Sequence, residues 1–453
     1  MSARWFGTDG IRGKAGVEPL VPDTLARLGR ALGDHAGGEP VLIARDTRAS
    51  GPGIVDALVR GLVAAGSPVT DLGVMPTAGL PLEVRARGAA LGLVVSASHN
   101  PWKDNGIKVF GADGLKLSDG GEVALETRVE DLADSPPPDG GGATAQTEDG
   151  ASGYIAWMLD QFSDVDLSGM RLAVDCAHGS ATSTAPAVLE KLGAKVTALF
   201  DRPDGENINA ACGSTHLQAL AAQMSSGEYD AGLAFDGDAD RVLMVDRNGR
   251  TCDGDHMLGF LGPWLAESDE LPERTVVATV MSNLGLERML SAQDINLVRT
   301  PVGDRHVLAA MRAGGYGLGG EASGHLLFPV GDHVIGDGLF TALQVLSGLR
   351  QKGAGLSGVI DAVPRVPQVL INVPVAARPP IEELPGLGER VAALSAEHGD
   401  DLRIVLRYSG TEDLARVMIE GVDASLVDAL AAELAELWKS QIDDHAGKGA
   451  GST

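Results

Sequence analysis

Three stretches of this sequence repeat one pattern: a short apolar segment, a small polar turn, and then an apolar segment with helical spacing. The apolar segments span residues 41–44, 171–175 and 275–280. Buried strands that lead through a turn into a helix are typical of parallel sheets in α/β proteins. The chain has 453 residues, too many for one hydrophobic core. The pattern therefore predicts three related α/β units built on mixed, mostly parallel sheets.

Breaks in composition indicate where these units end. The run 135–143 is rich in Pro and Gly and stays polar to about Gly150, so it reads as a linker. A second break falls at 252–255, where a hairpin at Asn248-Gly249 leads into a helix. A third break is the Pro-punctuated stretch around 364–367.

Beyond the third break the pattern changes to a small C-terminal α+β unit. Its expected elements are a strand at 369–373, a helix at about 387–395, strands at 402–407 and 415–420, and a helix at 424–439. We therefore expect four domains, which span residues 1–150, 151–252, 253–366 and 367–445.

The charge balance excludes several classes of partner. Lys and Arg number 36 and Asp and Glu number 62, which gives a net charge of −26. Such a surface repels nucleic acid and anionic membranes, so neither is expected as a partner. It also repels small anions, so a phosphate ester would need a site where Arg, Lys or metal ligands are clustered.

Cysteine usage and hydropathy predict the compartment. The chain has three cysteines, an odd number, and no CxxC pair, as expected for a reduced intracellular protein. The first residues contain no apolar signal core, and no run of about 18 apolar residues occurs. We expect a cytoplasmic protein with no membrane-spanning segment.

Three aspartates alternate after an apolar run, at Asp236, Asp238 and Asp240. Alternate side chains of an extended backbone point the same way, so the three carboxylates would cluster and need a cation. Oxygen-only ligands favour a hard cation such as Mg²⁺. An EF-hand is excluded, because its sixth and twelfth positions would be Arg241 and Arg247 rather than Gly and Glu. A solvated acidic turn stays open, as does an aspartyl-type phosphatase with Asp236 as nucleophile.

A serine-containing loop follows the short apolar strand 91–95. It reads Ser-Ala-Ser-His-Asn-Pro and, two residues later, Asp-Asn-Gly-Ile-Lys, with two strong turn signals. The loop would lie at the C-terminal end of a parallel strand, where α/β proteins place ligands. Ser98 is the candidate nucleophile, with His99 beside it and Lys108 nearby. A turn whose serine only satisfies its own backbone is the alternative.

A loop between the two strands of the C-terminal unit is a candidate phosphate cradle. Arg407 and Arg416 flank it and offer charged forks that match a phosphate. Ser409, Gly410 and Thr411 offer hydroxyl groups and a flexible backbone whose N–H groups can surround an anion. An ordinary β-turn with surface arginines is the alternative.

Two more loops offer contacts to a sugar or a phosphate. In the loop 319–325, Glu321 and Ser323 provide oxygen atoms for sugar hydroxyls, and His325 is able to move protons near neutral pH. A buried structural histidine is the alternative for His325. Near the N-terminus, the Gly-rich turn 6–13 holds Arg12, a further candidate phosphate contact.

Together and in this order, these motifs resemble the α-D-phosphohexomutase superfamily, from Phe6 to about Gly421. Within it, five segments are similar to the phosphoglucosamine mutase branch, and the phosphomannomutase/phosphoglucomutase branch usually differs at the first and third of them. They are Phe-Gly-Thr-Asp-Gly-Ile-Arg-Gly (6–13), Ser-Ala-Ser-His-Asn-Pro (96–101), Asp-Asn-Gly-Ile-Lys (104–108), Asn-Ile-Asn-Ala (207–210) and Val-Gly-Asp-Arg (302–305).

The resemblance implies four domains around a central cleft and an isomerase that supplies cell-wall precursors. It would interconvert glucosamine 6-phosphate and glucosamine 1-phosphate through a phosphoserine and glucosamine 1,6-bisphosphate, which also serves as activator. It implies one Mg²⁺ per subunit, held by Ser98, Asp236, Asp238 and Asp240, and it allows a homodimer. The implied catalytic residues are Ser98, His99, Lys108, Arg12 and His325, and the implied substrate-binding residues are Glu321, Ser323, Arg407, Ser409, Gly410, Thr411 and Arg416.

The sequence departs from the family pattern at five positions. Tyr408 and Asp413 stand where the phosphate loop usually has Pro, and Ala322 replaces a usual Gln or Asn of the sugar loop. His306 replaces a usual Tyr and His178 a usual Asn. The charged residues are retained, which favours mutase chemistry, but Ala322 leaves a mutase for glucose or mannose phosphates open. A sugar-phosphate-binding protein without catalysis is a further alternative, disfavoured by the intact set of Ser, Asp and Arg residues.

Overall fold

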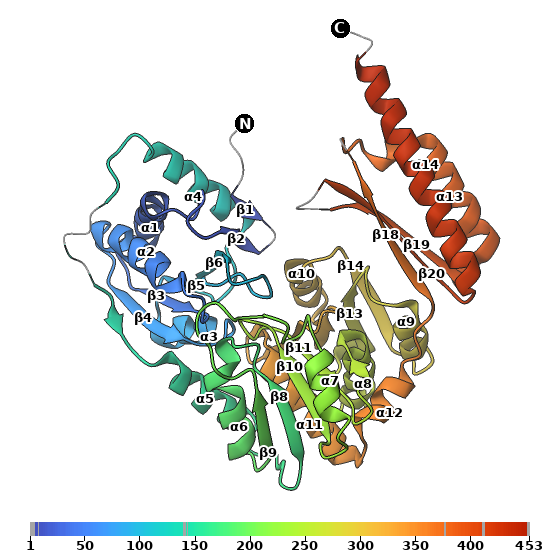
Figure 1. Ribbon diagram of the computed structural model, residues 1–453, viewed down its shortest axis with the longest axis horizontal. Helices are drawn as coiled ribbons and strands as arrows, with labels where there is room; N and C mark the ends of the chain where they lie inside the picture. The colour runs from blue at the N-terminus through green and yellow to red at the C-terminus, as the bar shows by residue number, and fades with distance from the viewer. Residues whose placement is uncertain are drawn as a thin grey trace.

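The computed structural model describes residues 5–7, 9–138, 142, 144–375, 377–409 and 413–450, with side chains as far as residue 442 apart from that of Pro385. Its four sheets follow one another in chain order along an arc (Figure 1). The β1–β2 hairpin and the C-terminal sheet stand at the two ends of this arc. Part of the expected linker, residues 139–141 and 143, lies outside the described residues.

The first sheet has seven strands in the order β1-β2-β6-β5-β3-β4-β7. Strands β3, β4, β5 and β7 run parallel, and β1, β2 and β6 continue the sheet in antiparallel fashion. The strands are β1 (Phe6–Gly7), β2 (Gly10–Lys14), β3 (Val41–Arg45), β4 (Val69–Val74), β5 (Leu91–Val95), β6 (Asp104–Gly111) and β7 (Gln146–Thr147); the helices are α1 (Pro22–Ala36), α2 (Gly51–Ala64), α3 (Gly79–Arg87) and α4 (Asp119–Asp131).

The second sheet has the order β12-β11-β10-β8-β9. Strands β8, β9 and β10 are parallel, and β11 and β12 are antiparallel, as the turn signal at Asn248-Gly249 predicts. The strands are β8 (Arg171–Asp175), β9 (Lys195–Leu199), β10 (Ala231–Phe235), β11 (Val242–Val245) and β12 (Thr251–Cys252); the helices are α5 (Gly150–Gln161), α6 (Ala185–Lys191) and α7 (Gln218–Met224).

The third sheet repeats this arrangement in the order β14-β13-β15-β16-β17. Strands β13, β14 and β15 are parallel, and β16 and β17 are antiparallel. The strands are β13 (Thr275–Thr279), β14 (Asn296–Thr300), β15 (Leu318–Gly320), β16 (Leu326–Val330) and β17 (His333–Gly336); the helices are α8 (Gly254–Glu267), α9 (Leu284–Ser291), α10 (Asp304–Gly314), α11 (Gly338–Lys352) and α12 (Leu356–Ala362).

One loop in each of these sheets joins a parallel strand to the antiparallel strand beside it. These loops connect β5 to β6, β10 to β11, and β15 to β16. They contain the serine motif, the aspartate triplet and the sugar loop, respectively. The three α/β units therefore present their candidate functional residues from equivalent positions of the fold.

The C-terminal unit is a three-stranded antiparallel sheet, β18 (Gln368–Pro374), β20 (Leu414–Gly421) and β19 (Leu402–Tyr408), packed against α13 (Pro385–His398) and α14 (Ala424–Ala450). Helix α14 extends beyond the predicted end at residue 439. Its buried stripe continues through Trp438 to Ile442, and no proline follows that would stop it.

One continuous apolar cluster spans the first three units, the first unit has a second cluster around α1 and α2, and the C-terminal unit has its own. Leu42, Leu172 and Val276 come from three different sheets and belong to the same cluster. A polar contact ties the C-terminal sheet to the third unit, because Arg403 donates to the carbonyl oxygens of Val280 (2.8 Å) and Ser282 (2.7 Å). Among the described residues, none of the helices combines the length and apolar character that a membrane span requires.

Glycines bring helices α1 and α2 into close contact in the first unit. A Cβ atom on Gly61 would lie 2.0 Å from the carbonyl oxygen of Ala26, and one on Gly29 would lie 2.2 Å from that of Leu58. Both obstacles are backbone atoms, which cannot swing aside as a flexible side chain can. Gly53, on the same helix as Gly61, has open space around it.

We expect Gly61→Ala to destabilise the protein by about 1–3 kcal/mol or more, because the added methyl group forces two helix backbones apart. Gly53→Ala should leave stability unchanged or raise it by about 0.5–1 kcal/mol, because alanine loses less entropy in a helix. Thermal unfolding of the full chain measures both variants. Equal melting temperatures for the two would contradict the role assigned to this contact.

Candidate active site

The serine loop places Ser98 at the end of β5, fully buried. Its Oγ donates a hydrogen bond to Oδ2 of Asp236, 2.5 Å away in the second unit. Its backbone is left-handed, with φ of 50°, a conformation that costs a non-glycine residue energy and marks functional sites. Its carbonyl oxygen accepts hydrogen bonds from Arg48 (2.8 Å) and Asn209 (2.9 Å). The sequence motif thus becomes a buried hydroxyl held against a carboxylate.

The aspartate triplet occupies the hairpin between β10 and β11. Asp236, Asp238 and Asp240 are all buried, and one oxygen from each lies within 4.8 Å of the others. Oδ1 of Asp238 and Oδ1 of Asp240 have no hydrogen-bond partner among the described residues. Three buried carboxylates, two of which have an oxygen without a hydrogen-bond partner, fit a hard divalent cation, since all the donors are oxygen atoms. The predicted cluster is therefore assembled, as a candidate cation site.

Lys108 lies beside this cluster rather than apart from it. Its Nζ contacts Oδ2 of Asp238 (2.9 Å), Oδ2 of Asp240 (3.0 Å) and Oδ2 of Asp9 (3.2 Å). Burial alone would lower the pKa of Lys108, but the three carboxylates hold it well above its usual value. For Asp240 the signs are opposite: burial would raise its pKa, and the positive charge of Lys108 is the main effect that keeps this pKa below its usual value.

Asp236 differs from its neighbours in electrostatic environment. Burial, and then the charges of Asp240 and Asp238, raise the pKa of Asp236 well above its usual value. The raised pKa means that the ionised form of Asp236 is stable only with a hydrogen-bond donor or a cation beside it. The Ser98 hydroxyl supplies the donor. Ser98 and the triplet therefore form one electrostatic unit.

A bridge of charges between the first and third units was missed in the sequence. Lys116 donates to Oδ1 of Asp9 (2.5 Å) and to Oδ2 of Asp304 (2.7 Å). Arg12 lies in strand β2 rather than in a turn, and it donates to Oδ2 of Asp9 (2.5 Å). Asp9 and Asp304 lie inside the quoted motifs 6–13 and 302–305, which was the available signal, whereas nothing local marks Lys116.

His99 contacts both Ser98 and a second residue missed in the sequence, Arg241. Its Nδ1 lies 3.4 Å from Oγ of Ser98 and accepts from a terminal nitrogen of Arg241, 3.2 Å away. Burial, and then the charges of Arg241 and Arg12, lower the pKa of His99 to about 4. His99 is therefore neutral near pH 7, with its proton on Nε2.

His325 has the opposite tautomer. Its Nδ1 donates to the backbone carbonyl oxygen of Asp240 at 2.8 Å, which leaves Nε2 as the acceptor in the neutral ring. Glu321 accepts from the backbone N–H of Gly303 (3.1 Å), while Ser323 is exposed at the tip of the loop. Gly324 lets this loop pack on β11, because a Cβ there would lie 2.1 Å from the carbonyl oxygen of Val242.

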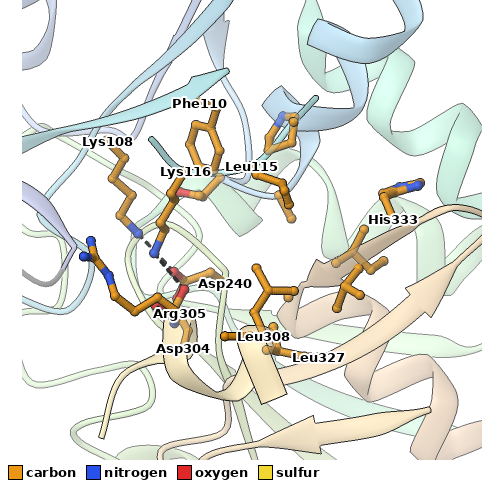
Figure 2. A pocket seen from close by; sticks show the side chains of 18 of the residues that line it. Lys108, Phe110, Leu115, Lys116, Asp240, Asp304, Arg305, Leu308, Leu327 and His333 are labelled. Atoms are coloured by element: carbon orange, nitrogen blue, oxygen red, sulfur yellow. Dashed lines mark hydrogen bonds and ion pairs between the residues drawn. The ribbon is translucent and has the colours of Figure 1, made fainter. Parts of the chain in front are cut away.

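A cavity of about 750 Å³ brings together five of the candidate residues, namely Arg12, His99, Asp240, Glu321 and His325. A second cavity, of about 340 Å³, adjoins it between the first and third units. Lys116, Asp240, Asp304 and His325 line both cavities, while Phe110, Leu115, Leu308 and Leu327 make the second one largely apolar (Figure 2). The first cavity is lined by Trp5, Phe6, Gly7, Asp9, Gly10, Arg12, His99, Lys116, Asp119, Asp240, Arg241, Val302, Gly303, Asp304, Arg305, Glu321 and His325.

The candidate phosphate loop lies apart, on the C-terminal sheet. Arg407 and Arg416 face each other across β19 and β20, and Ser409 is buried with its N–H bonded to the carbonyl oxygen of Leu414 (2.8 Å). Burial, and then the charge of Arg416, lower the pKa of Arg407. A bound anion would offset both effects. Gly410 and Thr411 lie outside the described residues.

Family models match four segments of this chain. The descriptions are those of phosphoglucomutase/phosphomannomutase, with α/β/α domain I at residues 3–135, domain II at 153–249, domain III at 253–366 and the C-terminal domain at 370–437. Curated relatives narrow the family. A phosphoglucosamine mutase from Desulfovibrio desulfuricans is 44% identical, covering 98% of this chain and 100% of the relative, and one from Symbiobacterium thermophilum is 43% identical, covering 97% and 99%.

This chain belongs to the phosphoglucosamine mutase family. It is therefore an isomerase of the intramolecular phosphotransferase kind. Solved structures confirm the fold. A phosphoglucomutase/phosphomannomutase family protein from Burkholderia thailandensis has a TM-score of 0.81 at 24% identity, covering 97% of this chain and 98% of that one. An N-acetylphosphoglucosamine mutase from Aspergillus fumigatus, solved with GlcNAc-6P and magnesium, has a TM-score of 0.64 at 19% identity, covering 97% and 96%.

We expect one divalent cation to bind per chain at the aspartate triplet. Titration with Mn²⁺, in which electron paramagnetic resonance monitors the signal of the free ion, measures this directly. Asp238→Asn should weaken binding by at least about tenfold, because a charged ligand is lost. Asp332→Asn, which changes an exposed carboxylate on the third unit, is the control and should bind as the unaltered protein does. Unchanged affinity in Asp238→Asn would exclude the triplet as the cation site.

Proposed function

We propose that this protein interconverts glucosamine 6-phosphate and glucosamine 1-phosphate through a phosphorylated Ser98 and glucosamine 1,6-bisphosphate. The observation that carries the proposal is the Ser98 hydroxyl, buried and aimed at the Asp236 carboxylate, in a chain more than 40% identical to phosphoglucosamine mutases. The domain boundaries at residues 150, 252 and 366 and the residue roles predicted from the sequence belong to the same proposal. The cytoplasm, supported by three buried free cysteines, and a homodimer also remain predictions.

The proposed reaction moves one phosphoryl group in each of two steps. The anomeric hydroxyl of the 6-phosphate attacks the phosphorus of phospho-Ser98, its proton leaves to a base, and the bond from phosphorus to Oγ breaks. After the bisphosphate turns over in the cavity, Oγ attacks the 6-phosphate and O6 regains a proton. Nε2 of His325 carries the lone pair that suits it as the proton acceptor.

Positive side chains would balance the charge that builds up on the transferring phosphate. Arg12, Arg241 and Lys116 line the same cavity as His99 and His325. Lys108 lies deeper in the protein, where its positive charge offsets the negative charge of Asp238 and Asp240. Neutral His99 would hold Arg241 through Nδ1 and keep Nε2–H as a donor. A Mg²⁺ ion, which Ser98, Asp236, Asp238 and Asp240 would hold, supplies Lewis-acid stabilisation of the phosphoryl group when bound.

The C-terminal loop would grip the phosphate that is not reacting. Arg407 and Arg416 lie side by side, so their mutual repulsion would be relieved by an anion. Glu321 and Ser323 would contact the sugar hydroxyls. The two reaction steps take place at opposite ends of the sugar, so the intermediate must reverse its orientation between them. A separate phosphate site on another sheet would hold the unreactive phosphate in either orientation.

The geometry disfavours the aspartyl-type phosphatase. Oδ2 of Asp236 already accepts a hydrogen bond from the Ser98 hydroxyl, and Oδ1 accepts one from the backbone N–H of Arg241, so neither oxygen is free to attack a phosphoryl group. The mutase for glucose or mannose phosphates uses the same catalytic residues, so only substrate comparison separates it from the proposal.

We expect purified protein with Mg²⁺ and a trace of sugar bisphosphate to convert glucosamine 6-phosphate much faster than glucose or mannose 6-phosphate. Phosphorus NMR identifies the product of each reaction. Ser98→Ala should lower the rate by at least about a thousandfold, because the phosphoryl carrier is lost. Faster conversion of glucose or mannose phosphate would assign a different sugar to the same chemistry. Turnover by Ser98→Ala would refute the phosphoserine.

We expect Arg407→Ala to raise KM for both sugar phosphates by about 10–100-fold, because a charge-assisted contact to phosphate is worth about 1.5–3 kcal/mol. Arg390→Gln is the control, since this arginine pairs with Glu433 on the helices of the same unit. Steady-state kinetics in both directions measure the effect. An effect in only one direction would argue against a loop that serves both phosphates.

A further inference from the structure

Arg48, in the turn after β3, is buried completely and uses every donor of its guanidinium group. Nε donates to Oδ2 of Asp46 (2.8 Å), which also accepts from Oγ of Ser96 (2.6 Å). The four terminal N–H groups donate to backbone carbonyl oxygens of the serine loop. These are the oxygens of Ser98 (2.8 Å), Asn100 (2.9 Å), Pro101 (2.6 Å) and Asp104 (3.0 Å).

This arrangement makes Arg48 a template for the loop that carries the nucleophile. Four carbonyl oxygens within seven residues point at one planar cation, which a regular strand or helix does not allow. A lysine has three donors without a fixed plane, so it cannot reproduce the five-point contact. The same interactions hold Ser98 in its left-handed conformation, which the residue would otherwise leave.

A second clamp reaches the same oxygens from another unit. Nδ2 of Asn209 donates to the carbonyl oxygens of Ser98 (2.9 Å) and Asn100 (3.1 Å). Asn209 is itself left-handed, with φ of 58°. The first and second units therefore fix the backbone of Ser98 together, while Oγ of Ser98 faces Asp236 from the second unit.

We propose that Arg48 is a positioning residue for phosphoryl transfer: it holds the Ser98 backbone so that Oγ faces the Asp236 carboxylate. The proposal rests on the proposed function, because it concerns the same nucleophile. Arg48 touches neither Oγ nor the cavity, so it acts through the position of Ser98 alone. Displacing a reacting atom by about 1 Å is enough to slow a reaction about a hundredfold.

The first test is Arg48→Lys, which keeps the buried positive charge beside Asp46. We expect kcat to fall about a hundredfold, with KM for both sugar phosphates changed less than about threefold. Single-turnover phosphorylation of Ser98 by sugar bisphosphate, followed by intact mass, should slow by the same factor. Arg299→Lys is the matched control, because Arg299 also grips a carboxylate and a backbone carbonyl oxygen, that of Ser282 (2.7 Å), outside the site.

The second test avoids a folding defect at Arg48. Asn209→Gly removes the other clamp, and glycine adopts the left-handed backbone without strain. We expect kcat to fall about tenfold with KM retained. Ala211→Gly is its matched control, since Ala211 lies in the same loop with φ of 53° and is exposed, so its activity should not change.

Wild-type turnover separates the two proposals. If the wild type does not interconvert sugar phosphates, or if Ser98→Ala does, the proposed function fails whatever Arg48 does. If the wild type is active and Ser98→Ala is not, wild-type kcat in folded Arg48→Lys overturns the positioning role. A loss of kcat that only follows the unfolded fraction, read from the melting curve, also overturns it. If Arg48→Lys does not fold, unchanged kcat in Asn209→Gly overturns the proposal instead.

Discussion

The site depends on confining three buried carboxylates, together with a hydroxyl, in a space of a few ångströms. Asp236, Asp238 and Asp240 repel one another, and burial strengthens that repulsion. Two positive side chains offset this repulsion: Lys108, which is buried among the carboxylates, and Arg241, which lies between Asp240 and the larger cavity. A protein with a net charge of −26 can therefore hold a phosphorylated ligand, because its positive charge is concentrated where negative charge is unavoidable.

Equivalent positions of the three α/β units carry the candidate functional side chains, in the loop that joins a parallel strand to its antiparallel neighbour. In the first two units, the turns after β3 and β8 contact that loop. Arg48 holds the loop of Ser98, and Ser180 donates its N–H to the carbonyl oxygen of Gly237 (2.9 Å) beside the triplet. In the third unit the corresponding turn receives Arg403 of the C-terminal sheet.

The sequence was sufficient for the residue types of the site but not for their long-range partners. Strand ends at β3, β5, β8 and β13 followed from apolar runs, and the Asp triplet from its spacing. Arg48 follows the apolar segment 41–44 by four residues, yet its burial depends on carbonyl oxygens some 50 residues away, which no local pattern reveals. Lys116 has no motif, and its partners lie 107 and 188 residues away in the chain. Helix α14 was drawn too short because its last turns contain few apolar residues.

The smaller, largely apolar cavity beside the candidate active site bears on how this enzyme can be inhibited. Molecules that imitate a sugar phosphate carry charge, which makes membranes hard to cross. This cavity of about 340 Å³ shares Lys116 and Asp304 with the larger one, while Phe110, Leu308 and Leu327 contribute to a largely apolar lining (Figure 2). A neutral compound bound there would gain about 25 cal/mol for each Å² of apolar surface it buries. For inhibitors of phosphate-binding sites, the charge that raises affinity usually lowers membrane permeability. A neutral inhibitor of this cavity would avoid that conflict.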